Sequence, residues 1–175
     1  TDTERRFYMK LNLLPILNFD GKKIHIDEKI SVSPRHDDTF KICSPVEFDG
    51  TVQNVGGTIE LCGTAEARLK LFCDRCGEEY ETTLRFVLNE SFKKADEFSD
   101  VDDNPDISML EGTSIDLDEI IYTNLFLNLP SKQLCSDDCK GLCPICGGNL
   151  NKTDCGCKSD TTDPRFDILD NLLGK

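Results

Sequence analysis

Eight of the ten cysteines in this chain stand in four closely spaced groups. Two groups have two residues between the cysteines and are followed by glycine, which readily takes the left-handed conformation that such a tight turn requires. Short spacing lets both sulfurs of a group converge on one atom, and four thiolates around one ion form a closed structural zinc site. The sequence therefore predicts about two zinc ions, with the ligands Cys73, Cys76, Cys135, Cys139, Cys143, Cys146, Cys155 and Cys157.

Spacing along the chain favours one division of these ligands, although the sequence leaves open which pairs share a metal. The last four, from Cys143 to Cys157, can close a small ribbon without long-range help. The other site would then join Cys73 and Cys76 to Cys135 and Cys139, and so fasten the two halves of the chain together. Closing such a long loop would add several kcal/mol to the free energy of folding, because the binding of structural zinc is itself folding free energy.

Two other uses of the cysteines fit the sequence less well. Disulfides would require an oxidising compartment, whereas short apolar runs and a start without a secretory signal favour the cytoplasm and no membrane. The spacing Cys139-x3-Cys143-x2-Cys146 is also that of radical S-adenosylmethionine enzymes. The short stretch after Cys146 leaves no room for their large α/β barrel, so we expect an accidental match. Cys43 and Cys62 lie in strand-like runs, where we expect small buried side chains.

The hydrophobic pattern predicts an α+β protein. Apolar residues alternate with polar ones through much of residues 9–88, which predicts an N-terminal antiparallel β-sheet or partly open barrel. Asp49-Gly50 and Gly56-Gly57 are turn signals between strands. The pair Cys73/Cys76 would lie in a hairpin of this sheet.

The second half of the chain has a different pattern. Residues 95–105 are too charged to pack, which favours an acidic linker. Asp116 and Glu119 form a capping box for a helix over about 117–127, which Pro130 ends. Asp163 and Pro164 begin a last helix. We therefore divide the chain into a sheet domain (1–94), an acidic linker (95–113), and a part with a helix, a cysteine-rich zinc ribbon and a C-terminal helix (114–175).

The net charge of −13 argues against binding of nucleic acid by a uniformly basic surface. Much of that charge is local, because residues 90–119 hold eleven acidic side chains and only two lysines. Four cations stand near the cysteines or the last helix: Arg75, Lys140, Lys152 and Arg165. These four are candidates for contact with RNA or a partner. The alternative for three of them, Arg75, Lys140 and Lys152, together with Lys158, is that they only offset the −2 charge of each metal site. No catalytic residue or small-molecule cofactor site is predicted, because closed thiolate sites leave no position for a substrate.

Several of these motifs together resemble the YceD family, also called large ribosomal RNA subunit accumulation proteins. The resemblance spans nearly the whole chain and rests on five segments: Cys73-Asp74-Arg75-Cys76, 139–147 (CKGLCPICG), Asn149-Leu150-Asn151, Cys155-Gly156-Cys157 and Asp163-Pro164-Arg165-Phe166. It implies a non-enzymatic zinc protein that supports accumulation or processing of 23S ribosomal RNA in biogenesis of the large subunit. The implied partners are ribosomal RNA, ribosomal proteins or both. The alternative is a zinc-ribbon adaptor for a protein complex unrelated to the ribosome.

Overall fold

A computed structural model describes residues 9–33, 35, 40–94 and 107–157. Sheet forms most of the core and helices are few, in agreement with the predicted α+β class. The strands and helices, in chain order, are β1 (Lys10–Asn12), α1 (Leu14–Leu17), β2 (Lys23–Ile30), β3 (Lys41–Ile42), β4 (Val46–Val55), β5 (Thr58–Phe72), β6 (Glu79–Lys94), β7 (Ile107–Leu110), β8 (Ser114–Asp116) and α2 (Leu117–Leu127).

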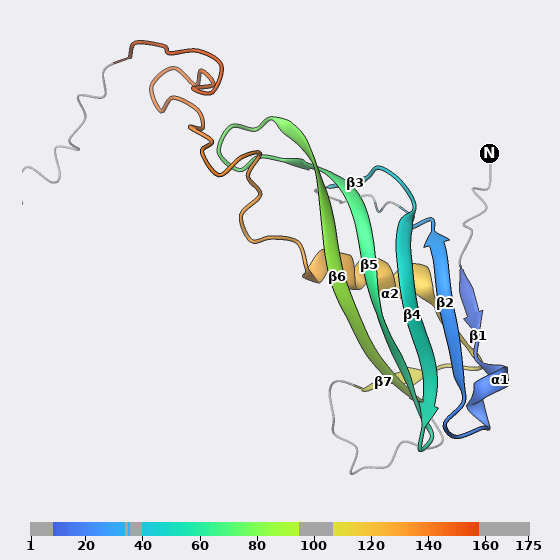
Figure 1. Cartoon of the computed structure of the whole chain (residues 1–175). Helices are drawn as coiled ribbons and strands as arrows, with labels where there is room; N and C mark the ends of the chain where they lie inside the picture. Colours follow the sequence, from blue (N-terminus) through green and yellow to red (C-terminus); the bar gives the residue numbers. More distant parts are fainter. Residues whose placement is uncertain (1–8, 34, 36–39, 95–106, 158–175) are drawn as a thin grey trace, which may run out of the picture.

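The main sheet has the strand order β2-β4-β5-β6-β7, and β3 pairs with the part of β5 that extends beyond the start of β4. Its strands are antiparallel except at β6 and β7, which pair in parallel. β5 and β6 form one long hairpin that extends past the rest of the sheet (Figure 1). Cys73 and Cys76 lie at the tip of this hairpin, between the last residue of β5 and the first of β6.

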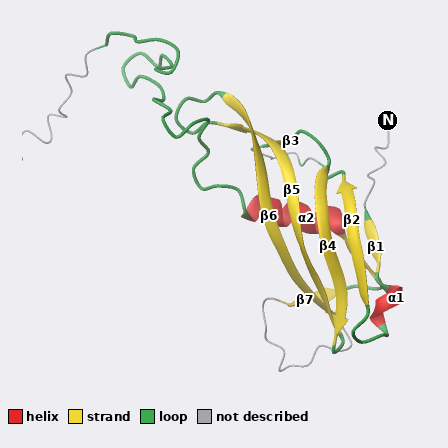
Figure 2. Ribbon diagram, viewed as in Figure 1, coloured by secondary structure: helices red, strands yellow, loops and turns green. Residues whose placement is uncertain are grey.

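Helix α2 lies across one face of the sheet, while the other face carries no helix in the described part of the chain (Figure 2). The helix has the predicted bounds, and the Asp116 side chain caps it by accepting hydrogen bonds from the backbone N–H groups of Asp118 and Glu119. Leu117, Ile121 and Leu125 are fully buried in the same hydrophobic core as the sheet. A helical stripe and an alternating sheet face thus form one core.

Asp49-Gly50, predicted as a turn, instead lies inside β4, and Gly50 pairs with Gly63 of β5. A Cβ on Gly63 would lie 2.7 Å from the Phe48 ring and 2.7 Å from the Asp49 carbonyl oxygen. The two glycines therefore make room for the ring of Phe48, which is buried. The predicted turn at Gly56-Gly57 is confirmed, because it joins β4 to β5.

The structure differs from the sequence prediction at two exposed cysteines and in the predicted linker. Cys43 and Cys62 were expected to be buried, but both are exposed; at Cys62 this is because its side chain falls on the uncovered face of the sheet. Ile107–Leu110, placed in the predicted linker, form β7 because Leu110 reaches the core. The helix predicted after Asp163 lies outside the described residues.

Asn54 is a buried polar side chain that joins α1 to the β4–β5 turn. Its Nδ2 donates hydrogen bonds to the carbonyl oxygens of Ile16 (2.9 Å) and Leu17 (3.0 Å), and its Oδ1 accepts one from the backbone N–H of Gly57 (3.0 Å). We expect Asn54→Ala to lower the free energy of unfolding by about 2 kcal/mol, because the Leu17 carbonyl and the Gly57 N–H lose the hydrogen bonds that Asn54 makes with them. Urea denaturation measures this. Gln53→Ala, on the opposite face of β4, is the control, and equal losses in both variants would contradict the prediction.

Candidate metal centres

The first group of thiols joins the tip of the β5–β6 hairpin to the segment after α2; we call it the hairpin group. It contains Cys73, Cys76, Cys135 and Cys139, whose sulfur atoms all lie within 4.8 Å of one another. Two of the separations, Cys73 Sγ to Cys139 Sγ and Cys76 Sγ to Cys135 Sγ, are both 3.8 Å. All but Cys135 are buried.

The second group, called the ribbon group, contains Cys143, Cys146, Cys155 and Cys157, again with all sulfur atoms within 4.8 Å. A bridge between Leu142 and Asn149 closes the short ribbon that carries the first two of these cysteines. Cys143 is buried and the other three are exposed. This is the division into two groups that spacing along the chain favoured.

The two Cys-x2-Cys turns have the same backbone structure. In the hairpin, the N–H of Cys73 donates to the carbonyl of Glu78 (2.9 Å) and the N–H of Gly77 donates back to the carbonyl of Cys73 (2.8 Å). In the ribbon, the N–H of Cys143 donates to Gly148 (2.8 Å) and that of Gly147 to Cys143 (2.9 Å). Each turn needs the left-handed backbone of its glycine, with φ of 70° at Gly77 and 72° at Gly147.

The sulfur geometry fits a tetrahedral ion. For sulfur atoms about 2.3 Å from a central zinc, the edge of a regular tetrahedron is about 3.8 Å. The Cys73–Cys139 and Cys76–Cys135 sulfur separations in the hairpin group equal that edge. Each group could therefore hold one metal ion, and four thiolates are a donor set that suits zinc.

Backbone hydrogen bonds prepare one thiol of each turn for metal binding. Those from Cys135 and Cys76 lower the pKa of the Cys73 thiol to about 6. Those from Cys146 and Ile145 lower the pKa of Cys143 to about 6. At neutral pH these two sulfurs are therefore thiolates, the form that binds metal.

Other thiols of the same groups keep their protons more firmly. Hydrogen bonds from the Cys157 thiol to the sulfurs of Cys155 and Cys146 raise the pKa of Cys157 to about 12. Four adjacent thiols cannot all carry a charge by themselves, because like charges at this distance repel. A divalent cation would remove that restriction, and its binding would release protons.

The spacing shared with radical S-adenosylmethionine enzymes does not correspond to one site. Cys139 belongs to the hairpin group, whereas Cys143 and Cys146 belong to the ribbon group. A cluster ligated by these three cysteines is therefore not supported. The chain between Cys139 and Cys143 passes from one group to the other instead.

The hairpin tip and the segment after α2 are held together by more than sulfur. The N–H of Asp74 donates to the carbonyl of Gln133 (2.8 Å), and the N–H of Gln133 donates to the Asp74 carboxylate (2.7 Å). The Arg75 guanidinium donates to the carbonyl of Cys139 (2.9 Å), which fixes the loop that carries two of the ligands. The sequence offered no signal for the contact with Gln133.

The four predicted RNA- or partner-binding cations have different surroundings. Arg75 binds backbone carbonyls beside the hairpin group. Lys152 forms a 2.6 Å ion pair with Glu78, which lowers the pKa of that carboxyl group. Lys140 and Lys152 both line a shallow hollow of about 390 Å³ on the ribbon. Arg165 lies outside the described residues.

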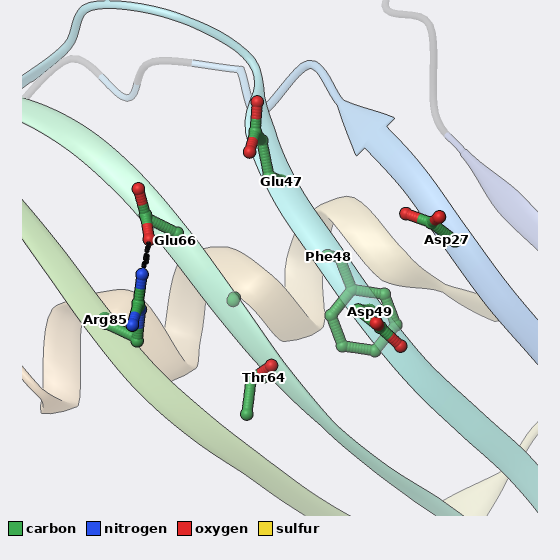
Figure 3. Close-up of a pocket in the computed structure, with 8 residues that line it drawn as sticks. Asp27, Glu47, Phe48, Asp49, Thr64, Glu66 and Arg85 are labelled. Atoms are coloured by element: carbon green, nitrogen blue, oxygen red, sulfur yellow. Dashed lines mark hydrogen bonds and ion pairs between the residues drawn. The ribbon is translucent and has the colours of Figure 1, made fainter.

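The uncovered face of the sheet has a hollow of about 370 Å³ whose lining includes four carboxylates (Figure 3). Three of these contact a basic side chain: Glu66 contacts Arg85, Glu47 contacts Lys29 at 2.6 Å, and Asp49 contacts His25 at 3.9 Å. Asp27 and Asp49 complete the acidic set. The hollow holds neither a nucleophile with an adjacent base nor a group of metal-ligating thiols, so the cysteine groups are the stronger candidate site.

Across the described ranges, no helix is both long enough and apolar enough to cross a membrane.

Sequence comparisons match the chain to one protein family and to several relatives. The profile of the family described as "Large ribosomal RNA subunit accumulation protein YceD" matches residues 61–173. An uncharacterized protein of Mycobacterium tuberculosis is 29% identical over 130 residues, which cover 74% of this chain and 62% of the relative. One from Mycobacterium leprae is 29% identical over 132 residues, or 74% and 60% of the two chains. The chain thus spans less than two thirds of the length of these mycobacterial relatives.

A plant protein is similar over a shorter stretch. The chloroplastic "Large ribosomal RNA subunit accumulation protein YCED homolog 1" of Arabidopsis thaliana is 36% identical over 62 residues, covering 35% of this chain and 19% of the relative. No solved structure matches the chain.

Proposed function

The chain belongs to the YceD family of large ribosomal RNA subunit accumulation proteins, and on this premise we propose that it supports accumulation or processing of 23S ribosomal RNA in biogenesis of the large ribosomal subunit. The family match over residues 61–173 is the observation that carries this proposal. That range includes all eight cysteines of the two groups. The metal centres therefore belong to the part of the chain that relates it to the family.

The proposed role is that of a zinc-binding factor without enzymatic activity. Each group supplies four thiolates to one ion, and a zinc with four protein ligands has no open position for water or substrate. The hairpin group lies where the sheet meets the segment after α2. Zinc would therefore fix the ribbon to the sheet and present the ribbon surface to a partner.

The hollow lined by Lys140 and Lys152 is the surface with which the chain would meet phosphate groups. Lys152 already pairs with Glu78, so Lys140 is the better phosphate ligand of the two. Arg165 would add a further positive charge from the C-terminal part. The rest of this acidic chain would face ribosomal proteins, which are the second class of proposed partner.

Depletion of the protein in its own organism tests the proposed function. Sucrose-gradient profiles should show fewer large subunits relative to small subunits, and sizing of ribosomal RNA should show precursors of the large-subunit RNA. The unaltered gene should restore both. A normal subunit ratio without precursors would contradict the proposal.

Charge reversal at Lys140 tests the surface. We expect Lys140→Glu to lower the affinity for a large-subunit RNA fragment several-fold and to reduce the slope of log affinity against log salt by about one, because one phosphate contact is lost. Lys23→Glu, at the start of β2, makes the same charge change in another region of the chain. Equal effects of the two variants would mean that only net charge matters. Zinc content should stay unchanged in both.

The double variant Lys140→Glu and Arg165→Glu tests the same surface in the cell. Expressed in the depleted organism, it should fail to restore assembly of the large subunit.

The second candidate function, a zinc-ribbon adaptor unrelated to the ribosome, is favoured by two apolar side chains on the ribbon. Leu142 is 46% exposed and Ile145 is 54% exposed. Exposed apolar residues on a small rigid unit are common at protein interfaces. A normal ribosome profile after depletion, together with full zinc content, would favour this function.

A further inference from the structure

Asn151 makes a contact that connects the two thiol groups. Its side-chain Nδ2 donates a hydrogen bond to Cys139 Sγ at 3.2 Å. Its Oδ1 accepts a hydrogen bond from the backbone N–H of Lys140 at 2.8 Å. Both ends of the amide are therefore used, and the donor is held toward a sulfur of the hairpin group.

The donor belongs to the ribbon, although the sulfur belongs to the hairpin group. Asn151 lies between Cys146 and Cys155 in the sequence, and both of these are ribbon thiols. Asn149 Oδ1 accepts hydrogen bonds from the backbone N–H of Asn151 (2.9 Å) and from its side chain (3.0 Å). The position of the donor thus depends on the turn that follows the second Cys-x2-Cys motif.

That turn is fixed to the hairpin by two further contacts. Asn149 Nδ2 donates to the Glu78 carboxylate at 3.3 Å, and the N–H of Leu142 donates to the carbonyl of Arg75 at 3.2 Å. Gly141 allows this approach, because it has φ of 75° and a Cβ there would lie 3.1 Å from the Arg75 carbonyl oxygen. The ribbon therefore meets the hairpin through its backbone as well as through Asn151.

The chemistry of the hairpin group gives this donor a role. Four thiolates around one divalent ion leave a charge of −2 in a largely buried place, so a donor to one sulfur stabilises the loaded form. Partners of this kind, which hold or polarise a ligand, typically change metal affinity by about 10- to 100-fold.

We propose that Asn151 is a positioning residue that couples the two metal centres, so that a loaded ribbon group raises the metal affinity of the hairpin group. This rests on the proposed zinc binding. In a ribbon without metal, Cys146 and Cys155 on either side of the turn of Asn149 and Asn151 are not fixed by an ion. The donor to Cys139 is then held less firmly. Metal is therefore taken up cooperatively.

Titration of the full chain with Co²⁺ tests the coupling, because tetrathiolate cobalt has an intense sulfur-to-metal charge-transfer band. Asn151→Asp is the informative variant: it keeps an oxygen for the Lys140 N–H but cannot donate to sulfur. It is measured in the natural chain and in a chain with Cys143→Ser and Cys146→Ser, where only the hairpin group binds. Asn89→Asp, on the exposed face of β6, is the matched control.

In the natural chain, we expect Asn151→Asp to weaken the hairpin group about tenfold and to shift its charge-transfer band to longer wavelength. In the chain without Cys143 and Cys146, the hairpin group should already be about tenfold weaker, and Asn151→Asp should add little. The same factor in both backgrounds, or no change in either, would overturn the coupling. Absence of any charge-transfer band in the natural chain would instead refute zinc binding itself, before any variant is compared.

Discussion

Replacement of Cys73 and Cys76 together by serine is expected to reduce the zinc content by about half and to release the ribbon from the sheet. These two residues are the only hairpin-group ligands on the β5–β6 hairpin. Cys135 and Cys139 alone cannot hold a structural zinc, which needs four ligands. Elemental analysis of the purified protein measures the metal, and limited proteolysis measures the release of the segment after α2.

The loss of stability should be large as well. The metal closes the loop between Cys76 and Cys135, and structural zinc contributes to folding on the order of 10 kcal/mol in small domains. The sheet and α2 should nevertheless stay folded, because they share an apolar core that contains no thiol of either group. We therefore expect the segment after α2 to become protease-sensitive while circular dichroism still shows the sheet.

Cys62→Ser is the matched control, since Cys62 is exposed and belongs to neither group. It should leave zinc content and protease resistance unchanged. Unchanged zinc content after loss of Cys73 and Cys76 would show that the hairpin group does not bind zinc. The ribbon group would then be the only metal centre among the described residues.

Gly63→Ala is expected to destabilise the sheet by about 3 kcal/mol, the upper part of the range for overpacked cores. A Cβ at this position would lie 2.7 Å from the carbonyl oxygen of Asp49, 2.7 Å from the Cα of Gly50 and 2.7 Å from the Phe48 ring. Two of these neighbours are backbone atoms of the adjacent strand, so no side-chain rotation relieves the clash. Urea denaturation should show a lower midpoint with an unchanged slope.

Thr64→Ala is the control for this prediction, because Thr64 is the next residue of β5 and its side chain lies on the exposed face. It should cost well under 1 kcal/mol, as is usual for surface substitutions. Phe48→Leu combined with Gly63→Ala should recover only part of the loss, since the backbone contacts remain. Full recovery would mean that the ring alone requires the glycine.

Features that depend on residues close together in the chain could be predicted from the sequence. Helix α2 begins and ends where its cap and its apolar stripe predict, because a capping side chain and the first N–H groups of a helix are adjacent in the chain. The two Cys-x2-Cys turns also follow from short spacing. Spacing favoured the division of the eight thiols into two groups, but only the structure brings Cys73 and Cys76 to Cys135 and Cys139. The family resemblance rested on the same local motifs, and the family match confirms it.

Two features could be seen only in the folded protein: which face of a strand is covered, and which side chains make contacts between distant segments. Asp49 and Gly50 are residue types typical of a turn, yet Gly50 lies inside β4. Its missing side chain leaves room for the Phe48 ring and for the backbone of β5. Cys62 is a residue type that is usually buried in a strand, but it is exposed because α2 covers the other face of the sheet. The hydrogen bond from Asn151 to Cys139 also depends on how ribbon and hairpin meet. Local sequence cannot specify these contacts, because the register of two strands and the face of a sheet are set by packing between distant residues.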